Sequence, residues 1–208
     1  MAKTPAQNDI STDERIKEAA RSVFTRKGYA ATRTRDIAEE AGINLALLNY
    51  YFRSKEKLFN LIMTESVQKF MQVLKDVLNN EQTSLEEKIE LIVNVYTDVL
   101  SQNPSLPLFI LSEIRTHPDE LLSNMGIKDF IFTSHFIRQY QQLTREKGQK
   151  GMHPLQLIMT IIGMTVFPFI ASPLVQKIVD LNEQAFLAMM QERKKILPVW
   201  IKAILDAG

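Results

Sequence analysis

The chain has 208 residues, a formal net charge of +1 at pH 7 and no cysteine. Its length allows it to bury a core in one large domain or two smaller ones, while the lack of cysteine excludes a disulfide framework and fits a reducing compartment. Residues 1–60 hold 11 Lys and Arg against 8 Asp and Glu, a modest basic excess that suits a nucleic-acid partner without indicating one. The polar first residues predict no signal peptide, so we expect a cytoplasmic protein.

The first predicted helix runs from about Thr12 to Lys27, because Ser11 and Glu14 have the spacing of a capping box. Its apolar residues recur at helical spacing and predict a stripe that supports the elements after it: Ile16, Ala19, Ala20, Val23 and Phe24. Arg26 would lie with Lys27 in the last turn of this helix. There the two cations either favour the helix dipole or contact phosphate.

Residues 32–55 predict two short helices joined by a tight turn. Ile37, Ala38 and Ala41 lie on one side of the first of these helices. Gly42 follows at the point where a helix ends on a left-handed residue, a conformation that glycine adopts without steric cost.

The second short helix begins after Asn44, whose side-chain oxygen suits an N-cap. Leu48 and Phe52 lie four residues apart and are expected to face a small core. That arrangement leaves four residues pointing largely outward: Leu45, Ala46, Asn49 and Tyr50. Two helices of this size across a glycine turn predict a helix-turn-helix, whose second helix can enter a DNA major groove.

The segment from Gly28 to Phe59 resembles the DNA-binding domain of the TetR family of bacterial transcriptional regulators. The shared features occur in the family's order: Gly28-Tyr29, Ile37-Ala38, Ala41-Gly42-Ile43, Leu48, Tyr51-Phe52 and Ser54-Lys55-Glu56. The resemblance implies an all-α protein with an N-terminal three-helix helix-turn-helix DNA-binding domain and a C-terminal helical ligand-binding and dimerisation bundle. It also implies a homodimer joined through the last two helices, because a two-fold protein reads a two-fold operator.

The resemblance assigns ten residues to DNA binding. Three match positions at the start of the recognition helix that approach base edges: Asn44, Leu45 and Ala46. Five match positions that contact phosphates: Thr34, Arg35, Tyr50, Tyr51 and Lys55. The other two differ from the family pattern, which favours a capping threonine at one position and often has a tyrosine at the other: Arg33 and Asn49.

Several of these assignments have an alternative. Asn44 either pairs with an adenine edge or only caps its helix, and Leu45 either meets a thymine methyl or packs on a neighbour. Tyr51 is a candidate for the core as well as for phosphate contact. Because arginine replaces the capping threonine, we expect the cap to move to Thr32 or Thr34.

Ser54 is expected to cap a long amphipathic helix that starts near Lys55 and reaches about residue 80. Its apolar positions lie near helical spacing: Leu58, Ile62, Phe70, Val73 and Val77. The family resemblance implies that this helix connects the DNA-binding domain to the regulatory domain. A break at 81–83 follows, and a second capping box at Ser84 and Glu87 predicts a buried helix of about five turns.

The remaining chain predicts four more helical segments. One follows Pro107 and ends at Pro118, and a second runs from Ile127 to Lys147 with apolar residues on most sides. A third, residues 154–176, contains no charged residue, and we expect a buried or interface helix that kinks or ends near Pro168 rather than a membrane span. The last, about residues 182–207, should bend or split in two at Pro198.

Chemistry other than binding finds little support in the sequence. His117, His135 and His153 are 18 residues apart, so no two share a helix face as metal ligands would. The sequence has no glycine-rich phosphate loop, no nucleophile elbow and no cysteine nucleophile. We therefore expect neither an enzyme nor a bound cofactor or metal.

A ligand site is expected in the larger domain, again from the family resemblance. The candidates are an aromatic and methionine set: Phe109, Phe132, Phe136, Tyr140 and Met159. Residues of this kind at helical spacing also form plain core. Because the apolar segments hold few charges, we expect an apolar or amphipathic small ligand.

These expectations combine into one architecture: a disordered arm at residues 1–10, a DNA-binding domain at 11–56 and a regulatory and dimerisation domain at 57–208. We expect a ligand-responsive transcriptional regulator, a repressor that binds a palindromic operator as a homodimer. We expect no membrane among its partners. Two alternatives remain: a helical ligand carrier that does not use DNA, and a membrane-associated helical protein using residues 154–176.

Overall fold

The computed structural model describes residues 11–125, 131–148 and 151–207, and within these ranges it contains helices and no strand. The arm expected at residues 1–10 lies outside the described residues. The chain divides into two compact units, of which the first ends at Ser66 and the second begins at Val67. Both of these residues belong to one helix, α4 (Lys55–Asn79), which also contains the boundary expected at residues 56 and 57.

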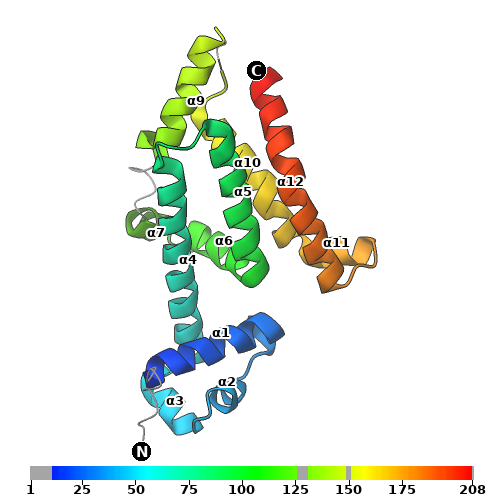
Figure 1. The fold of residues 1–208 in the computed structure, drawn as a ribbon. Coiled ribbons are helices and arrows are strands. Elements are labelled where there is room, and N and C mark those ends of the chain that lie inside the picture. Colours follow the sequence, from blue (N-terminus) through cyan, green and yellow to red (C-terminus); the bar gives the residue numbers. More distant parts are fainter. Residues whose placement is uncertain (1–10, 126–130, 149–150, 208) are drawn as a thin grey trace, which may run out of the picture. The chain divides into compact units, whose positions relative to one another are not determined.

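The first unit consists of α1 (Thr12–Ala31), α2 (Thr34–Glu40), α3 (Leu45–Phe52) and the beginning of α4 (Figure 1). Each helix contributes apolar side chains to one small core: Ile16, Ala19, Ala20, Val23, Phe24, Ile37, Ala38, Leu48, Leu58 and Ile62. This arrangement confirms the predicted apolar stripe of the first helix and the inward positions Ile37, Ala38 and Leu48, whereas Phe52 is only half-buried.

The end regions of α1 differ from the prediction. Ser11 makes no side-chain cap hydrogen bond, so the expected capping box is wrong, and Glu14 instead forms an ion pair with Lys17. The helix continues to Ala31 across Gly28, whose φ of 73° interrupts the helical geometry. Arg26 therefore does not lie in the last turn.

The two cations near the end of α1 are paired within the unit. Arg26 pairs with Glu40 at 2.9 Å, and Lys27 pairs with Asp36 at 3.2 Å. The Arg26 guanidinium, followed by the Ser22 hydroxyl, holds the pKa of the Glu40 carboxyl below its usual value. These pairs join α1 to α2.

The second unit contains the rest of α4 and seven further helices described by the structure: α5 (Leu85–Gln102), α6 (Leu106–Thr116), α7 (Pro118–Met125), α9 (His135–Glu146), α10 (Pro154–Ile170), α11 (Ser172–Ile178) and α12 (Glu183–Ala207). Helix α5 packs against α9, α10 and α12, and its long contact with α12 is visible in Figure 1. The core is formed largely from these helices and α4: Phe70, Leu74, Ile89, Ile92, Val93, Phe136, Ile137, Leu157, Ile161, Leu197 and Ile201.

A buried lysine fastens the turn between α4 and α5. The Lys88 side chain has no exposed surface, and its ammonium donates to the Asn80 carbonyl at 2.5 Å and to the Thr83 carbonyl and hydroxyl at 2.6 and 2.8 Å. Gln139 of α9 also donates to the Thr83 carbonyl, at 2.8 Å. Burial lowers the pKa of Lys88, and the oxygen atoms around its ammonium replace the lost water.

The capping box predicted next to this turn is confirmed. Ser84 Oγ accepts from the Glu87 backbone N–H at 3.2 Å, and the Glu87 carboxylate accepts from the Ser84 backbone N–H at 2.7 Å. Val73 was expected on the buried side of α4 but is 45% exposed. The inward positions are Leu74 and Leu78, because one face of a helix of this length continues from Phe70 in steps of four.

The helix expected from Ile127 to Lys147 is not continuous in its described part. Residues 126–130 lie outside the described residues. Helical structure is interrupted at Ser134, and α9 begins at the next residue. The Ser134 side chain accepts from the Ile137 backbone N–H at 3.4 Å and donates to the Ile131 carbonyl at 2.7 Å. A serine that bonds the backbone locally favours a helix start over a helix interior, which explains the break.

The two proline-containing segments have different outcomes. Helix α10 ends at Ile170, two residues after Pro168, as expected, whereas α12 runs as one helix through Pro198 and is not split. No single described helix is long and apolar enough to cross a membrane. Only α10 and α11 taken together pass that test of length and composition, and they are bent by 64° relative to each other.

We expect Lys88→Met to lower the free energy of unfolding by about 1–3 kcal/mol, because three hydrogen bonds of the buried ammonium are lost. The Asn80 carbonyl then keeps only the Thr83 hydroxyl as a donor, and the Thr83 carbonyl keeps only Gln139. Urea unfolding followed by circular dichroism measures the change. Lys195→Met, at an exposed position of α12, is the matched control and should leave the midpoint in place. Equal midpoints for the two variants would contradict the structural role of Lys88.

Candidate nucleic-acid interface

The turn between α2 and α3 is built as the sequence predicts. Gly42 has a φ of 64°, in the left-handed region that favours glycine. Asn44 is the N-cap of α3, and its side-chain oxygen accepts from the Leu47 backbone N–H at 2.8 Å. The glycine ends one helix and the asparagine begins the next, so two residues set the direction of α3.

Helix α3 has one buried face and one exposed face. Leu48 is fully buried, whereas Tyr50 is 80% exposed and Tyr51 is 42% exposed, so Tyr51 is not core. The two tyrosine rings are perpendicular, with centroids 5.5 Å apart. Three other predicted DNA-binding residues are also exposed: Leu45, Ala46 and Asn49.

The start of α2 is capped by a route that the sequence analysis did not predict. Arg33 is the N-cap residue, and its backbone N–H donates to the Asp36 carboxylate at 2.9 Å. Thr32 donates to the Gly28 carbonyl at 2.7 Å, so the expected shift of the cap to Thr32 or Thr34 is wrong. The Arg33 backbone bond, followed by the Lys27 ammonium, keeps the pKa of Asp36 below its usual value.

Lys55, at the first turn of α4, has partners within its own unit. Its ammonium donates to the Tyr29 and Thr32 carbonyls at 2.9 Å each and lies 4.2 Å from the centroid of the Tyr29 ring. The side chain therefore ties the link between α1 and α2 to the start of α4. Its contact with a DNA phosphate remains a prediction, because those two bonds leave one N–H for it.

The exposed arginines beside α3 have no such partners. Among the residues that the structure describes, the side chains of Arg33, Arg35 and Arg53 form no ion pair, unlike Lys17, Arg21, Arg26 and Lys27. Arg53 follows the last residue of α3 with a φ of 24° and was missed by the sequence analysis. Its position two residues after Tyr51, at the end of the predicted recognition helix, was the signal that could have found it.

We expect Asn44→Ala to lower the free energy of unfolding by about 1 kcal/mol and Asn44→Ser to retain it, because serine replaces the lost acceptor of the N-cap. Urea unfolding of both variants checks this expectation. Alanine and serine variants of equal stability would contradict the capping role. A stable serine variant with weakened DNA binding would reveal a second, base-reading role for the amide.

The five predicted ligand residues are not brought together. Phe132 and Met159 are exposed and Phe109 is half-buried, whereas Phe136 and Tyr140 are buried. Phe136 borders an apolar cavity of about 170 Å³. The Tyr140 hydroxyl donates to the Met152 carbonyl at 2.6 Å, in a different part of the unit.

A larger apolar cavity of about 610 Å³ lies among α4, α5, α6, α7 and α10. Its lining is aliphatic and aromatic, and includes Phe70, Met71, Tyr96, Leu100, Ile110, Leu111, Ile114, Ile162, Val166 and Phe167. None of the five predicted residues lines it. The sequence pattern could not find it, because a residue beside a cavity has the same helical spacing as a residue in a packed core.

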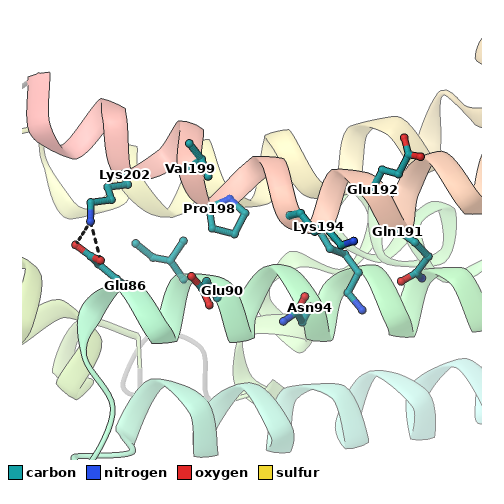
Figure 2. A pocket seen from close by; sticks show the side chains of 11 residues that line it. Glu86, Glu90, Asn94, Gln191, Glu192, Lys194, Pro198, Val199 and Lys202 are labelled. Carbon is teal, nitrogen blue, oxygen red and sulfur yellow. Dashed lines mark hydrogen bonds and ion pairs between the residues drawn. The ribbon is translucent and has the colours of Figure 1, made fainter.

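A groove of about 710 Å³ between α5 and α12 has the opposite character. Figure 2 shows Glu86 and Glu90 of α5 facing the lysines and Gln191 of α12, and Lys202 pairs with Glu86 at 2.8 Å. Because acidic and basic groups are mixed, the groove is typical of a solvated contact between two helices and does not suit the apolar ligand expected here. No group of three metal-ligating side chains occurs within the described ranges.

Comparisons with known proteins agree with this geometry. Residues 16–62 match the family model described as bacterial regulatory proteins, tetR family. The chain is 25% identical over 209 residues to the Probable HTH-type transcriptional regulator YttP of Bacillus subtilis, with 96% of each protein covered.

Solved structures are similar over most of the chain. The fatty acid degradation regulator FadR of Bacillus halodurans aligns with a TM-score of 0.56 at 20% identity, over 92% of this chain and 97% of that one. FadR of Bacillus subtilis, solved in complex with stearoyl-CoA, aligns with a TM-score of 0.51 at 18% identity, over 87% and 96%. At these identities the likeness is one of fold.

Proposed function

This chain belongs to the TetR family of bacterial transcriptional regulators, and on that basis we propose that it is a homodimeric repressor that binds a palindromic operator and responds to a small ligand. It acts on DNA in the cytoplasm and performs no catalysis. The observation that carries the proposal is the exposed face of α3, where tyrosines and apolar residues stand outward beside unpaired arginines.

Different residues of the recognition helix α3 contact the bases and the phosphates of the operator. Leu45 and Ala46, near its start, approach base edges, and the apolar Leu45 side chain suits a thymine methyl. Tyr50 and Tyr51 contact phosphates at its other end, together with Arg35 at the start of α2 and Arg53 after α3. Because phosphate contacts displace counterions, affinity for the operator falls steeply with added salt.

A homodimer accounts for apolar surface that the isolated chain leaves in solvent. Leu155 and Met159 of α10 are exposed, as are Ile196, Val199 and Trp200 of α12. In an isologous dimer the same patch of each subunit faces its copy, so these two helices from each chain form a four-helix interface. A two-fold protein then presents two α3 helices to two half-sites.

The ligand site of this proposal is the apolar cavity of about 610 Å³. Its volume lies within the range of roughly 300–1,000 Å³ that is typical of small-molecule sites. The similar FadR structure holds stearoyl-CoA, and a fatty acid metabolism regulator of Bacillus subtilis is 24% identical over 106 residues. Both support an apolar or amphipathic ligand.

Helix α4 provides the route from ligand to DNA. Val67, Phe70 and Met71 of α4 line the cavity, and the same helix begins at Lys55 in the first unit. A ligand that favours one position of α4 and an operator that favours another are coupled through it, so each weakens the other's binding.

We expect selection from a randomised duplex pool, at near-physiological salt, to enrich an inverted repeat. Tyr50→Ala/Arg35→Ala should lose this enrichment, because both side chains are exposed, contribute to no core and are assigned to phosphates. Arg115→Ala, an exposed arginine of α6, is the control and should retain it. Enrichment that survives in the double variant would contradict the assigned interface.

Selection without any enriched sequence by ligand-free protein would contradict the repressor proposal. If the same protein still bound apolar ligands, that result would favour a helical ligand carrier. Enrichment of a single half-site would instead support sequence-specific DNA binding by this chain. It would contradict the palindromic operator.

We expect Trp200→Glu to convert the protein from twice the 23.9 kDa chain mass to the chain mass in sedimentation equilibrium, because a charged group replaces the apolar ring and must lose its water at the interface. Leu108→Glu, at a site of α6 that is also exposed, is the matched control and should remain dimeric. A dimer that tolerates glutamate at position 200 would place the interface elsewhere.

A further inference from the structure

Two apolar cavities of the second unit share part of their walls. Met71, Tyr96 and Ile162 line both the cavity of about 170 Å³ and the cavity of about 610 Å³. The smaller cavity continues toward α9 through Ser134 and Phe136, and the larger toward α6 and α7. The shared side chains belong to three different helices, α4, α5 and α10, so small rotations of these side chains can join the two spaces.

Tyr96 brings a polar group to this shared wall. Its ring packs against Phe70 with centroids 4.7 Å apart. The side chain is half-buried, desolvation raises the pKa of its phenol, and within the described residues its hydroxyl forms no hydrogen bond. The other polar side chain on the linings, Ser134, already bonds the Ile131 carbonyl and the Ile137 N–H.

The Tyr96 hydroxyl is the group on the shared wall that can recognise a polar atom of a ligand. It has no partner among the described residues, and tyrosine hydroxyls in apolar surroundings usually find one. Tyr140 follows that rule, since its hydroxyl donates to the Met152 carbonyl at 2.6 Å. Since no described residue bonds the Tyr96 hydroxyl, a ligand in the cavities can supply its partner.

Gly163 lies in the middle of α10 on the lining of the larger cavity. A glycine in a helix interior costs roughly 1 kcal/mol relative to alanine. A Cβ added there would meet no atom of the described chain within 4 Å, and the residue does not need a positive φ. Packing within the chain therefore does not require glycine, which keeps space for a ligand against the helix backbone.

We propose that the two cavities form one bipartite site for a long aliphatic chain interrupted by a single neutral oxygen group, a hydroxyl or a carbonyl, which hydrogen-bonds the Tyr96 hydroxyl. The inference rests on the proposed ligand function and names the chemical class of its ligand. Apolar segments on both sides of the oxygen group fill the two cavities. Gly163 lets the chain pass close to α10.

The residues that line the two cavities do not suit a charged group of the ligand beside Tyr96. Among the described residues, neither cavity is lined by Lys, Arg, His, Asp or Glu. A carboxylate placed beside Tyr96 would lose its hydration without gaining a counter-charge. Any charged head of the ligand therefore stays outside, past the exposed Leu111, Ile114 and Phe167 on the lining of the larger cavity.

The test is calorimetric titration of the purified full-length protein, without DNA, using stearic acid and its mid-chain hydroxy and oxo derivatives. We expect the oxygenated chains to bind about tenfold more tightly than stearic acid, the equivalent of one hydrogen bond in a buried site. Tyr96→Phe should abolish this preference while retaining binding of stearic acid. Tyr140→Phe removes a hydroxyl outside both cavities and should keep the preference.

Gly163→Leu tests the path of the chain separately. Leucine is a better helix former than glycine, so the variant should fold, and its side chain would fill the cavity. We expect all three probes to lose at least tenfold in affinity, while thermal unfolding shows no loss of stability.

Equal affinities of the three probes for the wild-type protein, or a preference that survives in Tyr96→Phe, would overturn the proposal. Absence of binding by every probe would overturn it as well. Because no DNA is present, these outcomes are independent of operator recognition: a failed duplex selection with intact ligand preference would overturn only the repressor function.

Discussion

Two ammonium groups hold the two ends of helix α4, and much of the rest of the structure depends on them. At one end, Lys55 donates to the Tyr29 and Thr32 carbonyls, which close the link between α1 and α2. At the other, Lys88 donates to the Asn80 and Thr83 carbonyls in the turn after α4. In both places a lysine reaches carbonyls that no regular helix or sheet would pair, and so replaces water with a fixed donor. Each clamp lies inside one compact unit, and α4 is the covalent connection between them.

In the proposed function, this construction is the route by which a ligand in one unit affects DNA binding by the other. Near its middle, α4 pairs with α1 through Glu65, which accepts from Lys17 and Arg21, and it then borders the apolar cavity through Val67, Phe70 and Met71. A ligand that moves this stretch acts on a helix whose ends are fastened to their own units. In the proposed function, the displacement is therefore carried along α4 to the first unit. The coupling is limited by the difference in ligand affinity between the two positions of α4, and it acts equally in both directions.

Local signals in the sequence predicted the DNA-binding end well. Gly42, the Asn44 cap and the inward Leu48 all follow from rules that involve a few neighbouring residues, and so does the capping box at Ser84. The failures involve competition between local rules or distant partners. Ser11 loses its capping bond although its motif is complete, Ser134 caps a new helix inside an apolar run, and Lys55 bonds carbonyls 23 and 26 residues away. The cavity was unpredictable because it is defined by what several helices leave empty between them.

The proposed functional surfaces are also where the chain departs from the most stable choice. Trp200 and Met159 leave apolar surface in solvent, Gly163 weakens the interior of α10, and the Tyr96 hydroxyl lines apolar cavities without a bond to any described residue. Each is unfavourable for the isolated chain, and the proposed partners would correct each of them: a second subunit the exposed patch, and a ligand the cavity. A sequence that agrees with its fold almost everywhere breaks local rules at its functional sites. The same logic separates the apolar cavity from the charged groove between α5 and α12, where Glu86 and Lys202 already satisfy each other and no partner is required.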